Sequence, residues 1–394
     1  KKRVVIFYFA LYQSFIKFAF DIEKVESMKF QKIDKYSSVS VELARFDREL
    51  DKCVSECQTM LHVEDDTLTY SQQLSALINA WRLFMEEEKF VPVFVRFFLS
   101  DAANQLPALQ KEFHDIFNST CCSVVQQAPL DGSKVAMWAY LQNGVDCVRL
   151  DDFSFRCSHG AYSHYWTGNM MMNEGDSALQ TEMIFKKYVS SLETKNISLT
   201  DNCVRTWLFV QNVDVNYKGV VKARKKVFEK HRLTPETHYI ASTGIEGRGS
   251  DAASLVRMDA YAVAGLKPGQ QQYLYGKTHL NPTYEYGVTF ERGVKVLYGD
   301  RSHLFISGTA SIDNKGDVLY EGDIVRQTER MWENISVLLQ EGGASFIDVA
   351  SMIIYLRDVS DREVVSKMYE KRFPDVPKVI LYAPVCRPGW LIEM

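Results

Sequence analysis

The last residues of the chain place an acid in apolar surroundings, which is a setting for proton transfer. Glu393 lies between Ile392 and Met394. Removing a carboxyl group from water disfavours its charged form and raises its pKa, so that it can act as a general acid near neutral pH. The alternative is a solvent-facing glutamate on an edge strand at the chain end. The two interpretations differ in whether the side chain is buried.

Cys386 and Arg387 lie shortly before this acid. A thiolate is a nucleophile, whereas a buried free cysteine is usually an inert core residue. Cys386 is therefore interpreted either as a nucleophile or as a small group that lines a cleft. Arg387 would lower the pKa of this thiol or hold a carboxylate, unless it is a solvated turn residue before Pro388.

Arginines at strand ends and small residues in turns are further candidates for binding an anion. Arg357 ends one expected strand and Arg205 begins another, and a guanidinium at either place can hold a carboxylate. Surface ion pairs are the alternative. Small residues let a ligand approach the backbone, whose amides can donate to an anion, although tight strand packing explains them equally well. These residues are Thr243, Gly244, Ser307, Gly308 and Thr309.

The elements that must position these side chains follow one another as strand, helix, strand, helix, strand, strand. Apolar residues at helical spacing and runs of β-branched residues define them. In the last hundred residues they are expected at 304–309, 323–341, 349–356, 361–372, 378–381 and 390–393. This order predicts an α+β fold with mixed sheets and helices packed on one face.

The same order occurs twice more, which predicts tandem modules. Gln180-Thr181 opens a helix in the middle of the chain as Gln327-Thr328 does later, and Asp101 corresponds to Asp358. A period this long indicates domains rather than a solenoid. The expected parts are an N-terminal extension with a helical lead-in at Val41–Leu61 (1–67), a degenerate module (68–150), a middle module (151–265), a connector (266–289) and a C-terminal module (290–394).

Composition limits the classes of function. The net charge of −4 argues against a nucleic-acid binder that uses a basic surface. The eight cysteines lack framework spacing, and neither C-x-x-C nor H-E-x-x-H occurs. Free thiols in a reducing, cytoplasmic compartment and no metal site are therefore expected. Residues 1–20 begin with Lys1-Lys2-Arg3 and an apolar run, but a leading strand or unstructured extension is favoured over a targeting or membrane segment.

The C-terminal module resembles the RidA/YjgF family, also called endoribonuclease L-PSP-like. That resemblance implies chorismate-mutase-like modules, which typically form trimers with a ligand cleft between neighbouring subunits. Three tandem modules would then fold as an intramolecular pseudo-trimer, with a homo-oligomer as the alternative. The motifs are Ile306-Ser307-Gly308, Glu333-Asn334-Ile335, Tyr355-Leu356-Arg357-Asp358 and Leu391-Ile392-Glu393.

Within that family, the middle and last modules look like chorismatases. The resemblance rests on Val204-Arg205-Thr206-Trp207, Tyr217, Ala223-Arg224, Ser242-Thr243-Gly244-Ile245 and 305–312. Chorismatases hydrolyse chorismate or convert it to a hydroxybenzoate, with a glutamate near the C-terminus as the acid and no cofactor. In the members that form 3-hydroxybenzoate, a cysteine precedes this acid by seven positions, as Cys386 precedes Glu393, and their small glycine corresponds to Gly244. This chain departs from the pattern in its extra N-terminal segment and in Glu246 and Arg248.

Chorismate carries two carboxylates and an enol ether. Cleavage of an enol ether needs a proton at the vinyl carbon, which gives an oxocarbenium-like species, and a carboxylic acid with a raised pKa suits that step. The resemblance thus implies cleavage to pyruvate and a hydroxybenzoate or dihydroxy acid. The expected partner is a small carboxylated metabolite, bound between the middle and last modules, rather than a nucleic acid or a membrane.

Two alternatives remain open. The first is a 2-iminoacid or enamine deaminase, whose typical carboxylate-binding arginine is Lys378 here, so that the bidentate fork is lost. The second is a non-catalytic metabolite-binding protein that keeps the cleft. The basic run 222–226 is interpreted as a solvated helix face. The tyrosines of the connector, Tyr286 among them, either line a pocket or cover the core, and cover is favoured.

Overall fold

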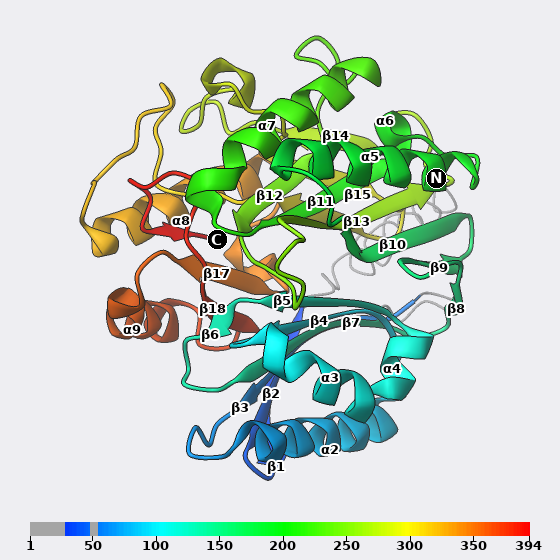
Figure 1. Cartoon of the computed structure of the whole chain (residues 1–394), viewed down its shortest axis with the longest axis vertical. Helices are drawn as coiled ribbons and strands as arrows, with labels where there is room; N and C mark the ends of the chain where they lie inside the picture. The colour runs from blue at the N-terminus through cyan, green and yellow to red at the C-terminus, as the bar shows by residue number, and fades with distance from the viewer. Residues whose placement is uncertain (1–27, 48–53) are drawn as a thin grey trace, which may run out of the picture.

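The computed structural model describes residues 28–47 and 54–394, and its first module is a six-stranded sheet in the order β1-β2-β3-β7-β4-β5. Helices α2 and α3 cover the outer face of this sheet (Figure 1). Helix α2 forms because Thr69 and Gln72 make a capping box and Leu74, Leu77 and Trp81 share its buried face. The elements are β1 (Lys29–Tyr36), β2 (Val39–Phe46), β3 (Glu56–Val63), α2 (Tyr70–Glu88), β4 (Val91–Leu99), α3 (Ala102–Glu112), α4 (His114–Ser119), β5 (Cys121–Gln126) and β7 (Val135–Gln142).

The expected helical lead-in at Val41–Leu61 is wrong, because its described residues form strands β2 and β3. Strand β3 pairs antiparallel with β7, more than seventy residues later in the chain. Both faces of β3 are covered, with Leu61 packed under the helices and Met60 facing the centre of the molecule. A strand buried on both faces has no period-2 pattern, so the sequence alone does not distinguish it from a buried helix.

The second module is another six-stranded sheet, in the order β12-β11-β13-β10-β9-β8, with α5 and α7 on its outer face (Figure 1). Its first strand begins before residue 151, within the range expected for the first module. The elements are β8 (Asp146–Arg149), β9 (Ser154–His159), β10 (Tyr162–Met171), α5 (Ser177–Glu193), α6 (Leu199–Asn202), β11 (Cys203–Val210), α7 (Val213–Lys230), β12 (Ala241–Glu246) and β13 (Val256–Ala264).

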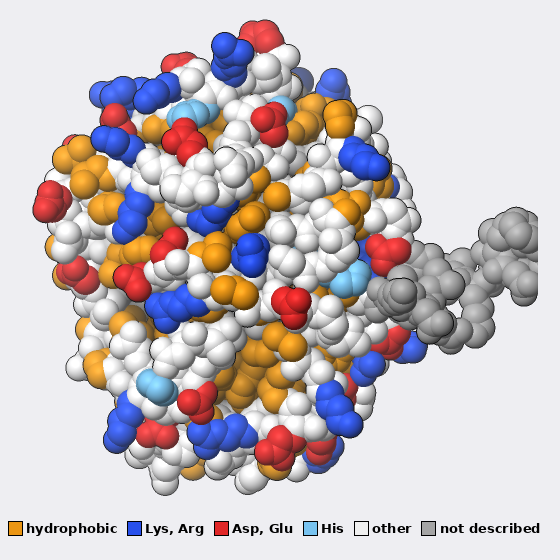
Figure 2. All heavy atoms as spheres, turned by 90° about the vertical axis from the view of Figure 1, so that its right-hand side faces the viewer, with side chains coloured by type: hydrophobic (Ala, Val, Ile, Leu, Met, Phe, Trp, Pro, Cys, Tyr) orange, Lys and Arg blue, Asp and Glu red, His pale blue; other side chains and the backbone are white. Residues whose placement is uncertain are grey.

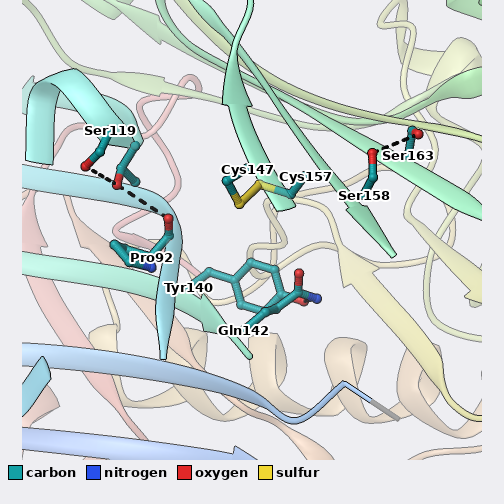
Figure 3. Close-up of a disulfide and its surroundings, with 9 residues drawn as sticks. Pro92, Ser119, Tyr140, Gln142, Cys147, Cys157, Ser158 and Ser163 are labelled. Carbon is teal, nitrogen blue, oxygen red and sulfur yellow. Dashed lines mark hydrogen bonds between the residues drawn. A yellow bond between two sulfur atoms is a disulfide. The ribbon is translucent and has the colours of Figure 1, made fainter. Parts of the chain in front are cut away.

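Strands β8 and β9 are joined by a disulfide between Cys147 and Cys157 (Figure 3). The antiparallel register sets these two residues directly opposite each other. The expectation of free thiols is therefore wrong for this pair. It was made from sequence spacing, which does not reveal cross-strand neighbours. Cys57, Cys121, Cys122, Cys203 and Cys386 are free, and Cys53 lies outside the described residues.

The third module combines a four-stranded sheet, β19-β17-β18-β6, with a three-stranded sheet, β14-β15-β16. Strand β6 comes from the first module, and β14 comes from the expected connector. The elements are β6 (Ala128–Pro129), β14 (Gln271–Leu274), η1 (Thr283–Tyr286), β15 (Gly293–Leu297), β16 (Ser302–Ile306), α8 (Ile324–Glu341), η2 (Phe346–Asp348), β17 (Met352–Leu356), η3 (Val359–Asp361), α9 (Arg362–Arg372), β18 (Lys378–Tyr382) and β19 (Ile392–Glu393).

The three modules meet around a common centre. Each contributes a parallel pair of strands, namely β4 with β5, β11 with β12 and β17 with β18. Three β-bridges join these pairs into a ring. They link Gln126 to Arg248, Ile245 to Val385 and Leu381 to Pro129. One apolar core, with residues from all three modules, lies between the sheets, while each helical layer packs over its own core. Tandem α+β modules therefore assemble within one chain.

The described surface is mixed in charge. On the face shown in Figure 2, basic and acidic side chains lie interspersed. Among the helices of the described ranges, none combines the length and apolar character needed to cross a membrane. Within the same ranges, His, Cys, Asp and Glu side chains form no group that could hold a metal ion. The segment 1–20 lies outside the described residues.

Candidate active site

A cavity of about 470 Å³ lies where the second and third modules meet. Helix α7 and strand β12 form one wall, residues around η1 form the second, and the C-terminal end of the chain forms the third. The volume is in the range of small-molecule sites. The lining residues that bear on the chemistry are Tyr217, Arg224, Gly244, Tyr286, Arg292, Gly308, Cys386, Arg387 and Glu393.

Glu393 is the acid of this cavity. Strand β19 is short but is held from both sides, since Glu393 pairs with Tyr355 of β17 and with Ala310. The side chain is 4% exposed, and its Oε1 accepts no hydrogen bond from the described residues. Burial raises the pKa of Glu393 to about 8, against the opposing charges of Arg205 and Arg292. The carboxyl group is therefore largely protonated near neutral pH, as a general acid must be.

Gly308 makes room for this carboxyl group. A Cβ atom at position 308 would overlap Oε1 of Glu393 and would also approach the Thr243 side chain. The backbone N–H of Gly308 donates to Oγ1 of Thr243 at 3.0 Å, which fixes the turn after β16. Gly308 therefore allows the Glu393 side chain to lie against the backbone.

Two buried arginines lack an acidic partner. Arg224 of α7 is 1% exposed and donates to Oγ1 of Thr289 at 3.2 Å and to Oγ of Ser242 at 3.4 Å. Arg292 is 4% exposed and donates to the carbonyl and side-chain oxygens of Asn281. Neither makes an ion pair with a described carboxylate. Because a buried guanidinium strongly favours an anionic partner, this pair is suited to hold substrate carboxylates.

The mouth of the cavity is basic as well. Lys218, Lys222 and Lys225 lie along one face of α7 and line it, and Arg387 stacks over Tyr286 at 4.5 Å. Among the described residues that line this cavity, Glu393 is the only acidic one. The interpretation of 222–226 as a solvated face is therefore wrong for Arg224, which is buried, whereas Lys222 and Lys225 are exposed at the mouth of the cavity.

Cys386 and Gly244 both lie at Tyr217. A Cβ atom on Gly244 would be 2.7 Å from Cε2 of Tyr217, so the glycine allows the ring to lie against β12. Burial, and to a smaller extent the nearby Glu393, raises the pKa of Cys386 to about 12, against an opposing hydrogen bond with Tyr217. The thiol is thus uncharged at neutral pH, which favours the cleft-lining interpretation over the nucleophilic one.

Five of the expected binding residues do not line this cavity. Arg357 forms an ion pair with Asp214 and donates to the carbonyl of Val385 at 2.9 Å. Ser307 and Thr309 are buried and make backbone hydrogen bonds that hold the turn after β16. Arg205 and Thr243 bond to each other and line a different cavity. Arg205 is close enough for its charge to oppose the raised pKa of Glu393, but neither arginine lines the cavity of this acid.

The residues at which the chain departs from its expected relatives have structural partners. Glu246 accepts hydrogen bonds from the backbone N–H of Asn212 at 3.0 Å and of Val213 at 2.7 Å, at the start of α7. The carbonyl of Arg248 accepts the bridge from Gln126. Lys378 donates to three backbone carbonyls, those of Phe373, Pro374 and Val376, and it does not line the cavity around Glu393.

Comparisons with known proteins agree with this architecture. The endoribonuclease L-PSP family model matches residues 291–394. A RutC family protein of Pyrococcus abyssi is 37% identical over 93 residues, which are 23% of this chain and 73% of that protein. The 3-hydroxybenzoate synthase of Streptomyces hygroscopicus is 24% identical over 242 residues, 54% of this chain and 68% of that protein.

Among solved structures, a chorismatase crystal structure superposes with a TM-score of 0.60 at 15% identity, covering 77% of this chain and 91% of the other. That match spans more than one module, whereas the family model covers the C-terminal module. The fold of the chain is therefore similar to that of a chorismatase, and the chain belongs to the RidA/RutC (endoribonuclease L-PSP) family.

Proposed function

We propose that this protein is an enzyme that cleaves the enolpyruvyl ether of chorismate or of a closely similar dicarboxylated enol ether. The observation that carries the proposal is the protonated Glu393 in a cavity with two buried guanidinium groups, of Arg224 and Arg292, that lack acidic partners. An uncharged acid can donate a proton, and two guanidinium groups can hold two carboxylates. The likeness to a 3-hydroxybenzoate synthase supports the same substrate.

The reaction begins with transfer of the Glu393 proton to the vinyl carbon, and the ether oxygen stabilises the resulting cation. In the hydrolytic course, water adds to this cation and the carbon–oxygen bond then breaks, which gives pyruvate and a dihydroxy acid. In the aromatising course, the ring carbon–oxygen bond breaks, the ether oxygen stays with pyruvate and the ring loses a proton to become a hydroxybenzoate. That proton restores Glu393, so this course consumes no co-reactant.

Cys386 would influence which course is followed. As an uncharged thiol beside Tyr217, it occupies space that water could otherwise fill. The relationship to 3-hydroxybenzoate synthase and the seven-residue spacing to Glu393 favour the aromatising course. In Cys386→Ala, the smaller side chain would leave room for water in the cavity, and the product ratio would move towards the dihydroxy acid.

The test is chorismate consumption by purified protein, followed by ultraviolet absorbance and chromatography of the products. We expect pyruvate and a hydroxybenzoate from the wild type, a loss of at least a hundredfold in Glu393→Gln, since general acids contribute about 10²–10⁴-fold, and no change in Glu363→Gln. Glu363 is an exposed acid on α9 and serves as the matched control. Chorismate left untouched at high enzyme concentration would rule out this substrate.

A deaminase is the second candidate, because the 3-aminoacrylate deaminase RutC of Acinetobacter baylyi is 30% identical over 93 residues. Against it, Lys378 is bound to backbone carbonyls and lies outside the cavity lining. Ammonia release from 2-iminoacids, with chorismate unaffected, would favour this candidate. Binding of chorismate without turnover of either substrate would favour a non-catalytic binding protein.

A further inference from the structure

A second cavity, of about 490 Å³, lies between the inner faces of the sheets. Residues of all three modules line it, among them Tyr140 of β7, Trp166 of β10 and Phe305 of β16. It shares no lining residue with the cavity around Glu393. The two cavities adjoin, because Thr243 of the second accepts a hydrogen bond from the backbone N–H of Gly308 in the first, but the chemistry proposed above does not use the second.

The walls of the second cavity are aromatic. Trp166 and Tyr261 stack with their ring centroids 4.3 Å apart, Tyr140 lies 5.7 Å from Trp166, and Phe305 lies 5.4 Å from Tyr261. Nε1 of Trp166 is buried and has no hydrogen-bond acceptor among the described residues. Such walls favour a flat, unsaturated ring, which gains from stacking and from removal of apolar surface from water.

A buried cation also lines this cavity. Arg205 is 4% exposed and lies over the ring of Trp207 at 4.9 Å. Its Nη2 donates to Oγ1 of Thr243, a neutral acceptor, while Nη1 has no partner among the described residues. A buried charge without a counter-ion is costly, and an anion bound beside it would remove that cost.

Arg96, the other buried arginine beside Trp207, differs from Arg205 in having an acidic partner. Arg96 lies in the same aromatic cluster, 4.9 Å from the ring of Trp207, but it forms an ion pair with Asp259 at 2.7 Å. Asp348 also lines the cavity and accepts a hydrogen bond from the backbone N–H of Ser345 at 2.9 Å. Glu56, the other acid in the lining, is paired with Arg301 at 3.1 Å and with His303 at 2.9 Å. Its negative charge is thus offset by its own partners and opposes an incoming anion little.

We propose that this second cavity binds a small aromatic carboxylate, with its ring against Trp166 and Tyr261 and its carboxylate on Arg205. Both parts of the ligand are needed, because the walls select the ring and the guanidinium selects the charge. The site stands whether or not the protein cleaves chorismate. If it does, a hydroxybenzoate product belongs to the class of ligand that this cavity takes.

The test uses the full chain and benzoate as the probe, with titration calorimetry and tryptophan fluorescence. Benzamide keeps the ring without the charge, and acetate keeps the charge without the ring. We expect each to bind at least tenfold more weakly than benzoate. Absence of benzoate binding at millimolar concentration, or equal binding of all three probes, would overturn the proposal.

Variants assign the binding to one cavity. We expect Arg205→Met to weaken benzoate binding at least tenfold, and Arg224→Met, in the cavity of Glu393, to leave it within twofold. Ser302→Trp adds bulk at an exposed lining residue and should block binding without removing a buried charge, in case Arg205→Met fails to fold. Loss in Arg224→Met with none in Arg205→Met or Ser302→Trp would place the ligand beside Glu393 and overturn the inference.

Discussion

The carboxyl group of Glu393 carries a free-energy cost that its neighbours offset only in part. Its pKa is about 8 in the folded chain, against the ordinary value of 4.5. Below pH 4.5 both the folded and unfolded states bind the proton. Between pH 4.5 and 8 the unfolded state releases it and the folded state keeps it, so stability falls as the pH rises. The same burial that prepares the acid for proton transfer thus destabilises the fold at neutral pH.

Glu393→Gln should therefore be inactive and more stable than the wild type at neutral pH. We expect a gain on the order of 1–3 kcal/mol in the free energy of unfolding at pH 7, because the glutamine has no proton to lose. Urea denaturation at several pH values measures it. The gain should vanish below pH 4.5 and level off above pH 8, and Glu363→Gln should show neither change. A constant difference at every pH would contradict the raised pKa.

At this scale the sequence indicated part of the site. Glu393, Cys386, Gly244, Gly308 and Arg387 were expected near one another and line one cavity. Arg292 was not expected there, and Arg224 was assigned to a solvated face, since burial of an arginine depends on what packs over it. A signal was nevertheless present, because Tyr217, Val221 and Arg224 follow one another at helical spacing and share the cavity face of α7.

Helix α7 carries Tyr217 and Arg224, and its N-terminus is held by a residue from another element. Its N-cap, Asn212, makes no side-chain capping bond. The carboxylate of Glu246 on β12 accepts from two backbone N–H groups there instead. A negative charge at this end also interacts favourably with the helix dipole. The acid that looked out of place in the sequence thus positions the helix that lines the cavity.

Glu246→Ala should cost about 1–2 kcal/mol in the free energy of unfolding, which is typical of a lost N-cap. It should also raise KM for the substrate more than it lowers kcat, since α7 would shift its binding residues and leave Glu393 in place. The control is Glu182→Ala, which removes an exposed ion pair with Lys226 and should cost less than about 1 kcal/mol. Equal losses in the two variants would argue against a capping role.

Elements whose apolar residues recur with one clear period were predictable from the sequence. A strand such as β3, which is buried on both faces, was not. Helix α8 was expected at 323–341 and spans Ile324–Glu341, and β18 was expected at 378–381 and spans Lys378–Tyr382. The range that forms β2 and β3 was mistaken for a helix, because β3 is buried on both faces and its partner β7 is distant in the chain. The pairing of β6 with β18, and the opposition of Cys147 and Cys157, also depend on contacts that local patterns do not encode.

At the scale of the whole molecule, the three bridges join strand edges of one module to the next within a single chain. In an assembly of separate subunits, the same edges would lie at the contacts between subunits. Three isolated modules would have to find each other in solution, whereas tandem modules are already linked. We expect a monomer of 45.3 kDa by size-exclusion chromatography with light scattering. Dilution should not alter the elution volume or the activity per chain. A mass three times larger would contradict the prediction.

Covalent linkage also frees the three junctions between modules to differ. In an assembly of identical subunits, every substitution appears at each junction at once, so an acid gained in one place is gained in all. Here Glu393 lies at one junction, while the ring is closed elsewhere by Gln126 with Arg248 and by Leu381 with Pro129. Symmetry is broken by sequence alone, so the proposed function would give the described part of each chain a single reactive centre, and a monomer would have no identical neighbour with which to cooperate.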